Sequence, residues 1–217
     1  MLKLFTAALL IFSGFLHSQT FEWVNIIPLD IQSNASYLHS KVTFDNSGNP
    51  VSAIIINFKE FYGQTYYGDI KIEMRNFSGS LEWEAAIIGK ADVSEIIVDG
   101  ENNIICIGTY RDSVLIGTTT LFQTTVNNGN FVAKFDNSGN FLWAKDGTEF
   151  ITQYGDITAL GNHGINSILI GISDFPIESK ILKLDSGGNI VSSIVQTEVA
   201  TVSDLNIDAS GNIWVTG

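Results

Sequence analysis

The sequence predicts an all-β protein, an incomplete β-propeller with about three and a half blades, each a four-stranded antiparallel sheet. Three observations predict this fold class. Tryptophan recurs at intervals of 60 residues, at Trp23, Trp83 and Trp143. Short apolar runs alternate with turns rich in Gly, Asn and Asp, a pattern typical of β-hairpins. No long helical period interrupts them, and four strands in roughly 45–60 residues match the size of a propeller blade.

The N-terminus has the pattern of a secretory signal peptide over residues 1–18. Lys3 precedes an apolar run from Leu4 to Phe15, and the small residue Ser18 stands at the expected cleavage edge. This run is too short for a membrane span, which needs about 20 apolar residues. The alternative is a buried N-terminal helix. We therefore expect a secreted chain, extracellular or on the outer surface of a bacterial cell, without membrane insertion of the mature protein.

One hairpin type carries the recurring Trp and is clearest over residues 130–145. Apolar residues alternate there with the period of a strand on both sides of a turn at 136–140. Asp136 can accept backbone hydrogen bonds within the turn, and Gly139 tolerates a positive φ. A further copy covers 180–192, with Ser192 at the position of the Trp.

A second hairpin type alternates with the first. Its copies are residues 95–108, 156–171 and 204–217, with a looser first copy over 41–56. Their apolar runs are nearly continuous, as in strands that are buried on both faces. We expect these hairpins to lie near the propeller axis. The Trp-bearing hairpins should lie outside, with each Trp packed between neighbouring blades.

The mature chain, 19–217, is thus expected to form a partial propeller. Its expected blades cover approximately 37–88, 92–146, 155–195 and 202–217, and residues 21–25 match a strand that closes the ring. Because a closed ring needs at least four blades, we expect the sequence to be the N-terminal part of a longer protein. A β-sandwich does not require a 60-residue repeat, and a parallel β-helix repeats at shorter intervals.

With these hairpins, the chain resembles the bacterial SBBP (seven-bladed β-propeller) repeat family. The resemblance is carried by Phe131–Asp136 with Gly139–Trp143, by Ser113–Leu121, and by Asp208–Gly217. The resemblance implies a secreted or surface protein of a Bacteroidetes-type bacterium, of a kind that often ends in a type IX secretion sorting domain. It implies no shared catalytic residues.

The net charge limits the classes of partner that the protein can bind, and the cysteine content limits its chemistry. The net charge is −12, with scattered acids, so nucleic acid and anionic lipid are poor partners. The one cysteine, Cys106, lies in an apolar strand and is expected to be a small buried hydrophobic residue rather than a nucleophile. The partner is expected to be an unknown protein or glycan.

The sequence predicts no catalytic residue, no cofactor and no metal site. Outside the signal peptide only His39 and His163 are present, at unrelated repeat positions, and no nucleophile elbow or phosphate loop appears. Arg75 and Arg111 are too few for a sialidase-like site. The Asp-x-x-Gly-Asn turns suggest calcium, but they lack the further oxygen ligands that a calcium loop needs, so plain turn chemistry is favoured.

Three acids form the candidate ligand-binding set. Glu95, Asp156 and Asp204 start the buried hairpins at positions that the repeats make equivalent, so they should gather at one mouth of the channel. There they can attract a cation or a sugar hydroxyl. The favoured alternative is that each caps a neighbouring backbone amide.

A second candidate patch is aromatic. Tyr62, Tyr66 and Tyr67 lie in an expected long connection of the first blade, where they form either a sugar or protein contact or ordinary packing.

The sequence as a whole predicts a non-catalytic binding and interaction scaffold. The alternative is a carbohydrate-active enzyme with its site at the channel mouth.

Overall fold

A computed structural model describes residues 40–62, 65–123, 128–151, 155–162, 167–174, 178–196, 201–208 and 210–217. Within these residues the protein consists of β-strands and turns with a single turn of 3-10 helix, which confirms the all-β fold class. The expected signal peptide (1–18), the expected ring-closing strand (21–25), His39 and His163 lie outside the described residues.

The strands pair antiparallel in three sheets. The largest has the order β1-β2-β3-β4-β5-β7-β8, with β6 paired to β5, the second has the order β12-β11-β10-β9, and β13 pairs with β14. The strands of the largest sheet are β1 (Ser40–Phe44), β2 (Pro50–Tyr62), β3 (Thr65–Arg75), β4 (Leu81–Val98), β5 (Ile104–Ile116), β6 (Thr119–Phe122), β7 (Gly129–Phe135) and β8 (Phe141–Asp146). The 3-10 helix η1 (Gly147–Glu149) is followed by β9 (Gly155–Asn162), β10 (Ser167–Asp174), β11 (Glu178–Asp185), β12 (Ile190–Gln196), β13 (Asp204–Ile207) and β14 (Ile213–Thr216).

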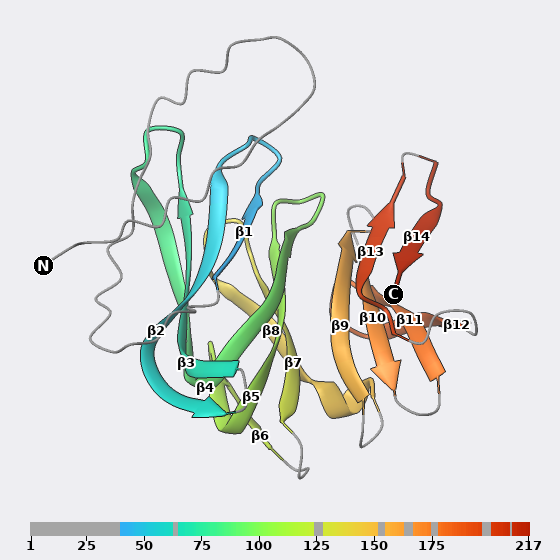
Figure 1. The fold of residues 1–217 in the computed structure, drawn as a ribbon. Coiled ribbons are helices and arrows are strands. Elements are labelled where there is room, and N and C mark those ends of the chain that lie inside the picture. The colour runs from blue at the N-terminus through green and yellow to red at the C-terminus, as the bar shows by residue number, and fades with distance from the viewer. Residues whose placement is uncertain are drawn as a thin grey trace, which may run out of the picture.

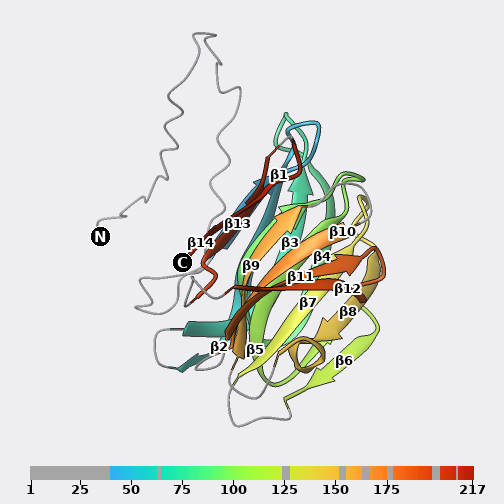
Figure 2. The same ribbon diagram turned by 90° about the vertical axis from the view of Figure 1, so that its right-hand side faces the viewer.

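The chain is arranged as successive layers, of which the largest sheet supplies two. The first half of β4 pairs with β3, whereas its second half pairs with the first half of β5, which in turn pairs with β7. We call β1, β2, β3 and the first half of β4 the first layer, and the second half of β4 with β5, β7 and β8 the second layer. The third layer is β9–β12, and β13 with β14 is the fourth. Figures 1 and 2 show these layers stacked in chain order.

An apolar cluster lies between each pair of successive layers. The first cluster joins Ile70 and Ile72 of the first layer to Cys106 and Ala133 of the second. The second cluster lies between the second and third layers and contains Ile105, Ile107, Val132, Ile157, Leu160, Ile168, Ile170, Leu182 and Leu184. The third cluster lies between the third and fourth layers and contains Ala159, Leu169, Ile181, Val202 and Leu205. Because the inner strands bury both faces, their sequences read as nearly continuous apolar runs.

Six hairpins share one five-residue turn. Its first residue is Asp or Asn, whose side-chain oxygen accepts hydrogen bonds from the backbone N–H groups two and four residues on. The fourth residue has a positive φ. The first residues are Asp45, Asn76, Asp99, Asp136, Asp185 and Asp208. The carboxylates of the Asp-x-x-Gly-Asn turns are therefore used in turn geometry, as plain turn chemistry predicts.

Two of the recurring Trp residues, Trp83 and Trp143, lie between successive layers. A Cβ added to Gly139, in the β7–β8 turn, would lie 2.6 Å from the Trp83 ring, and one added to Gly188, in the β11–β12 turn, would lie 3.0 Å from Trp143. The Trp143 indole N–H also donates to the backbone oxygen of Ser186, 2.8 Å away. Each indole thus packs on the glycine turn of the following layer. This is the packing between repeats that the sequence predicts.

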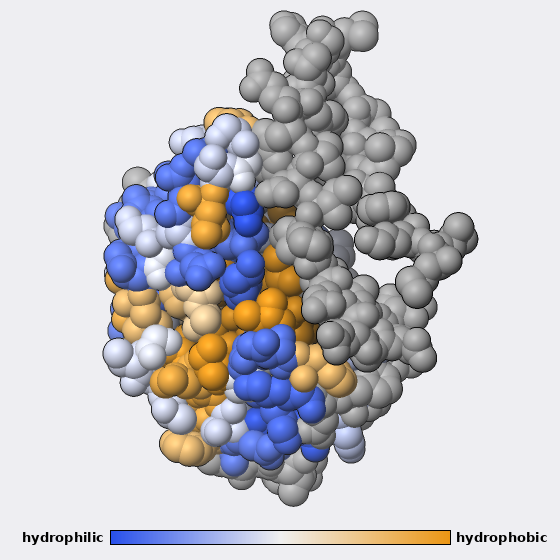
Figure 3. Space-filling model, turned by 90° about the vertical axis from the view of Figure 1, so that its left-hand side faces the viewer, coloured by the Kyte–Doolittle hydropathy of each residue, from blue (hydrophilic) through white to orange (hydrophobic). Residues whose placement is uncertain are grey.

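The first layer differs from the expectation in its long connection. The region of Tyr62, Tyr66 and Tyr67 is not a loop, because β2 and β3 continue through it as one hairpin with an irregularity between Ile56 and Glu60. On the layer's outer face, Val42 and Phe44 are exposed. Figure 3 views this side and shows an apolar area bordered by hydrophilic side chains.

Candidate functional site

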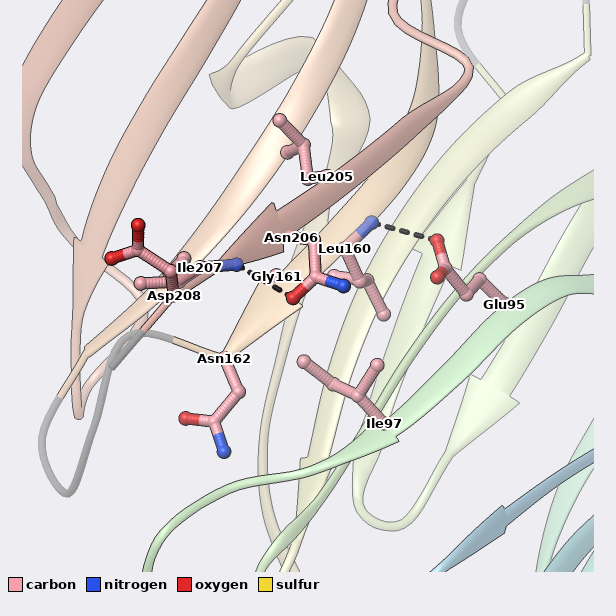
Figure 4. Close-up of a pocket in the computed structure, with 9 residues that line it drawn as sticks. All are labelled: Glu95, Ile97, Leu160, Gly161, Asn162, Leu205, Asn206, Ile207 and Asp208. Atoms are coloured by element: carbon pink, nitrogen blue, oxygen red, sulfur yellow. Dashed lines mark hydrogen bonds between the residues drawn. The ribbon is translucent and has the colours of Figure 1, made fainter. Parts of the chain in front are cut away.

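The candidate site is a groove between the first strands of successive layers. β1 packs against β4, β4 against β9, and β9 against β13. A groove of about 480 Å³ opens among the last three of these strands. It is lined by Glu95, Ile97, Leu160, Gly161, Asn162, Leu205, Asn206, Ile207 and Asp208. Figure 4 shows that Glu95 reaches across the groove from β4 to the backbone of β9.

Glu95 is the half-buried carboxylate of this groove. Its Oε2 accepts a hydrogen bond from the Leu160 backbone N–H, 2.7 Å away. Burial raises its pKa above the usual value, and repulsion from Asp204 adds to that rise, while the Leu160 N–H and the positive charge of Lys41 oppose it. Glu95 is therefore a carboxylate whose charge is only partly compensated within the protein.

The strand register explains why Lys41 and Asp204 both act on Glu95. Glu95 lies three residues before the last residue of β4, and Lys41 and Asp204 lie three residues before the last residues of β1 and β13. Each pairs with the matching position of the second strand, Lys41 with Ala53, Glu95 with Ile107 and Asp204 with Thr216. Asp204 is exposed, and its Oδ1 accepts from the adjacent Leu205 N–H at 2.8 Å.

The structure does not place Asp156 at the position equivalent to Glu95, so this part of the sequence alignment was wrong. β4 carries a bulge between Val93 and Glu95, and β9 carries the corresponding bulge between Ile157 and Ala159. The equivalent of Glu95 is therefore Ala159, and Asp156 lies three residues earlier. Its Oδ1 accepts from the Asn130 side chain of β7 at 3.3 Å, and it does not line the groove. Because both strands carry the same bulge, Asp156 corresponds to Asp92 of β4, and the two pair at equivalent positions with Ser173 and Thr109.

Three further polar residues line the groove and were not predicted from the sequence. Asn162 donates to the backbone oxygen of Val98 at 3.0 Å, which ties β9 to β4. Asn206 is exposed, and its Oδ1 accepts from the Ile207 N–H at 2.8 Å. Asp208 begins the β13–β14 turn, where hydrogen bonds from Asn212 lower its pKa. The alternation of Asn206 with Leu205 and Ile207 indicates only that its side chain lies on the face of β13 opposite to theirs, so no local signal marked it as a groove residue.

A second carboxylate at the end of β4 has a different environment. Asp99 is 2% exposed in its side chain and forms an ion pair with Lys134 of β7, which is 4% exposed, at 2.9 Å. Its oxygens also accept from the backbone N–H groups of Glu101 and Asn103 and from the Asn103 side chain. Burial opposes ionisation of Asp99, but the hydrogen bonds from Lys134 and Asn103 outweigh it and hold its pKa below the usual value.

Other chemistry-bearing residues lie outside the groove. Cys106 is fully buried in the first cluster, and burial raises its pKa to about 12, so the thiolate form is disfavoured at neutral pH. In the part of the chain that the structure describes, no group of three His, Cys, Asp or Glu residues could hold a metal ion. Among the same residues, no helix has the length and apolar character needed to cross a bilayer.

The three tyrosines of the expected aromatic patch have different surroundings. Tyr67 is buried, and its hydroxyl accepts from the Asn128 side chain at 2.7 Å. Tyr62 is exposed, with the Arg111 guanidinium carbon 3.9 Å from its ring centre. Tyr66 is tilted against Phe58. The three tyrosines therefore do not share one exposed surface.

The comparisons with known proteins find similarity at the level of structure. No protein-family model matches the chain, and no curated protein matches it. The chain is similar in structure to a protein of unknown function from Bacteroides caccae, at 13% sequence identity and a TM-score of 0.42. The match covers 75% of this chain and 49% of that one, so the chain spans about half the length of that protein. The resemblance to SBBP repeats stays a prediction.

Proposed function

We propose that the protein is an arc of a β-propeller, secreted or on the outer surface of a bacterial cell, that acts as a non-catalytic scaffold for binding a protein or glycan. The observation that carries this proposal is the open groove between the first strands of three successive layers. Stacked antiparallel layers whose first strands converge are the arrangement in which propellers place ligands near their axis. The four-strand composition of the first three layers supports the propeller architecture.

The lining of the groove indicates the chemistry of the ligand. Glu95 and Asp208 present carboxylates, and Asn162 and Asn206 present amides, beside apolar side chains such as Ile97. Carboxylate and amide oxygens accept hydrogen bonds from hydroxyl and N–H groups, which sugars and peptide backbones supply. The net charge of −12 disfavours nucleic acid. A neutral or cationic glycan or peptide fits best.

A binding experiment tests this proposal. The full chain is applied to glycan and peptide arrays, and ligands that bind are titrated by calorimetry against Asn206→Leu. This change removes an exposed polar group of the groove, and we expect it to weaken binding at least tenfold, the scale of about 1.4 kcal/mol. Asn137→Leu, on the exposed β7–β8 turn, is the matched control and should bind like the unchanged protein. Equal binding by Asn206→Leu would place the ligand outside the groove.

One observation favours the alternative function, a glycan-cleaving enzyme. The raised pKa of Glu95 is the direction that a general acid requires, and Asp204 acts on it electrostatically. Asp208, the other groove carboxylate, is held by the hydrogen bonds of its turn. Release of reducing ends from polysaccharides, abolished by Glu95→Gln, would establish this function. Binding without turnover would support the scaffold.

A further inference from the structure

The apolar part of the groove between β4, β9 and β13 is aliphatic throughout. All three strands contribute to it, with Ile97, Leu160, Leu205 and Ile207, and none of the nine lining residues is aromatic. The groove volume of about 480 Å³ lies within the range of small-ligand clefts, roughly 300–1,000 Å³. An aromatic ring is the side chain that offers a sugar ring a flat apolar surface. The lining therefore favours a flexible aliphatic chain over a sugar ring.

Glu95 keeps one carboxylate oxygen open to a ligand. Its Oε2 accepts from the Leu160 N–H at 2.7 Å, whereas no hydrogen bond from the described part of the chain reaches Oε1. Lys41 attracts Glu95 from β1 through its charge alone, without a hydrogen bond between the two side chains. No Lys or Arg is among the residues that line the groove. A cationic donor forms the strongest hydrogen bond with such an oxygen.

Asn206 supplies a donor on the other side of the groove. Its Oδ1 accepts from the Ile207 N–H at 2.8 Å, which fixes the orientation of the amide. Figure 4 shows the Asn206 nitrogen on the side of that residue that faces Glu95. An amide nitrogen donates to carbonyl oxygens, and every peptide backbone carries them. The groove thus offers an acceptor for a cation, a donor for a carbonyl group, and aliphatic walls for the chain that joins the two.

We propose that the groove binds a lysine side chain of a peptide or protein partner. The aliphatic stem packs on Ile97 and Ile207, and the ammonium group donates to Oε1 of Glu95, because lysine stems lie along apolar surfaces while the charged end stays in polar surroundings. Arginine fits less well, because a guanidinium group pairs best with both oxygens of a carboxylate and the Leu160 N–H already holds Oε2. The inference rests on the proposed binding function of the groove and names the group that the groove recognises.

The test is an NMR titration of the full chain with three small probes, the N-acetyl methylamides of lysine, norleucine and arginine. Norleucine keeps the four-carbon chain and lacks the ammonium group. We expect the lysine probe to shift the backbone amide signals of Leu160 and Asn206 and to bind at least about tenfold more tightly than the norleucine probe, since a hydrogen bond to a charged group is lost. The arginine probe should bind more weakly than the lysine probe.

Two variants locate the charge that the lysine probe recognises. Glu95→Gln keeps an oxygen for the Leu160 N–H and should reduce the affinity for the lysine probe to that for the norleucine probe. Glu84→Gln is the matched control, because Glu84 is an exposed acid on the same strand, outside the groove. It should bind the lysine probe like the unchanged protein.

The outcomes separate the lysine assignment from the binding function itself. Equal affinity for the lysine and norleucine probes, tighter binding of the arginine probe, or an unchanged lysine affinity in Glu95→Gln would overturn the assignment. If the arrays return only glycans, and Asn206→Leu weakens their binding, the groove is a binding site and the lysine assignment alone is wrong. If neither the probes nor any array ligand binds in the groove, both proposals are wrong.

Discussion

Asp99 and Glu95 stand four residues apart on the same stretch of chain and have opposite electrostatic environments. Asp99 is paired with Lys134 and hydrogen-bonded to its own turn, and its pKa is lowered. Glu95 accepts one backbone N–H and lies near Asp204, and its pKa is raised. A carboxylate whose oxygens are all engaged holds the fold together, whereas one that is partly desolvated and repelled by a neighbour gains from an added donor or cation. This difference is why we propose the groove, and not the Asp99 turn, as the ligand-binding site.

The largest expected effect is on the Asp99 pair. Lys134→Met keeps the bulk of the side chain but leaves Asp99 buried without its cation, and breaking such a pair costs about 3 kcal/mol or more. The free energy of unfolding, measured by urea denaturation, should fall by that amount at pH 7. Lys145→Met is the matched control on the neighbouring strand, because Lys145 pairs with the exposed Glu149. Its effect should stay below about 1 kcal/mol. Equal losses in the two variants would contradict the comparison.

The two carboxylates should give opposite pH dependence. Because the pKa of Asp99 is lowered in the folded state, its contribution to stability is present above the unfolded-state pKa and is lost as the pH falls through the folded-state pKa. Because the pKa of Glu95 is raised, the folded state holds its proton more tightly, and stability falls as the pH rises from the unfolded-state value through the folded-state value.

Glu95→Gln removes that titration while keeping an oxygen for the Leu160 N–H. We expect it to raise the free energy of unfolding at pH 7 by less than about 1 kcal/mol, the scale of most changes outside the core. The gain should disappear below pH 4, as measured by urea denaturation across pH. A loss of stability at pH 7 would show that the Glu95 charge is stabilising and would remove the contrast with Asp99.

The smallest effects should appear on the pKa of Glu95 itself. Asp204→Asn removes a repelling charge and should lower this pKa, whereas Lys41→Met removes an attracting charge and should raise it. Carboxyl carbon chemical shifts, followed by NMR during a titration, measure both changes. Each shift should be a fraction of a pH unit, because Asp204 is exposed and Lys41 is partly exposed and water screens charges there. Shifts in the same direction for both variants would contradict the inferred arrangement.

Much of the strand pattern could be predicted from the sequence, because it depends on local chemistry. The Asp-x-x-Gly-Asn turns fix each hairpin by hydrogen bonds within five residues, so the turns at Asp136 and Asp185 were readable directly. The recurrence of the Trp predicted that Trp143 packs between successive repeats, and the structure adds that it packs on a glycine turn. Glu95 and Asp204 hold equivalent positions on their strands, and their role in ligand binding stays a prediction.

The remaining features depend on contacts between distant segments. The Asp99–Lys134 ion pair joins residues of two hairpins, and the local sequence pattern of neither hairpin predicts it. Asp156 falls outside the expected set because β9 continues to Asn162, so that Asp156 lies six residues before the end of its strand and Glu95 only three before the end of β4. The sequence alignment matched the beginnings of the two apolar runs, whereas the structure matches their ends at the turn. Asn162 and Asn206 resemble ordinary strand and turn residues until the layers bring β4, β9 and β13 together.

The two long strands β4 and β5 determine which layers of the protein unfold together. Through them the first and second layers share one hydrogen-bonded sheet, whereas the third is a separate sheet. Opening either of the first two layers breaks main-chain bonds that belong to the other, so they should open as one cooperative unit. The third layer can detach at the cost of side-chain contacts and a few cross-links such as the one from Glu95 to Leu160. A ligand in the groove would bridge the boundary between these two units and slow their separation.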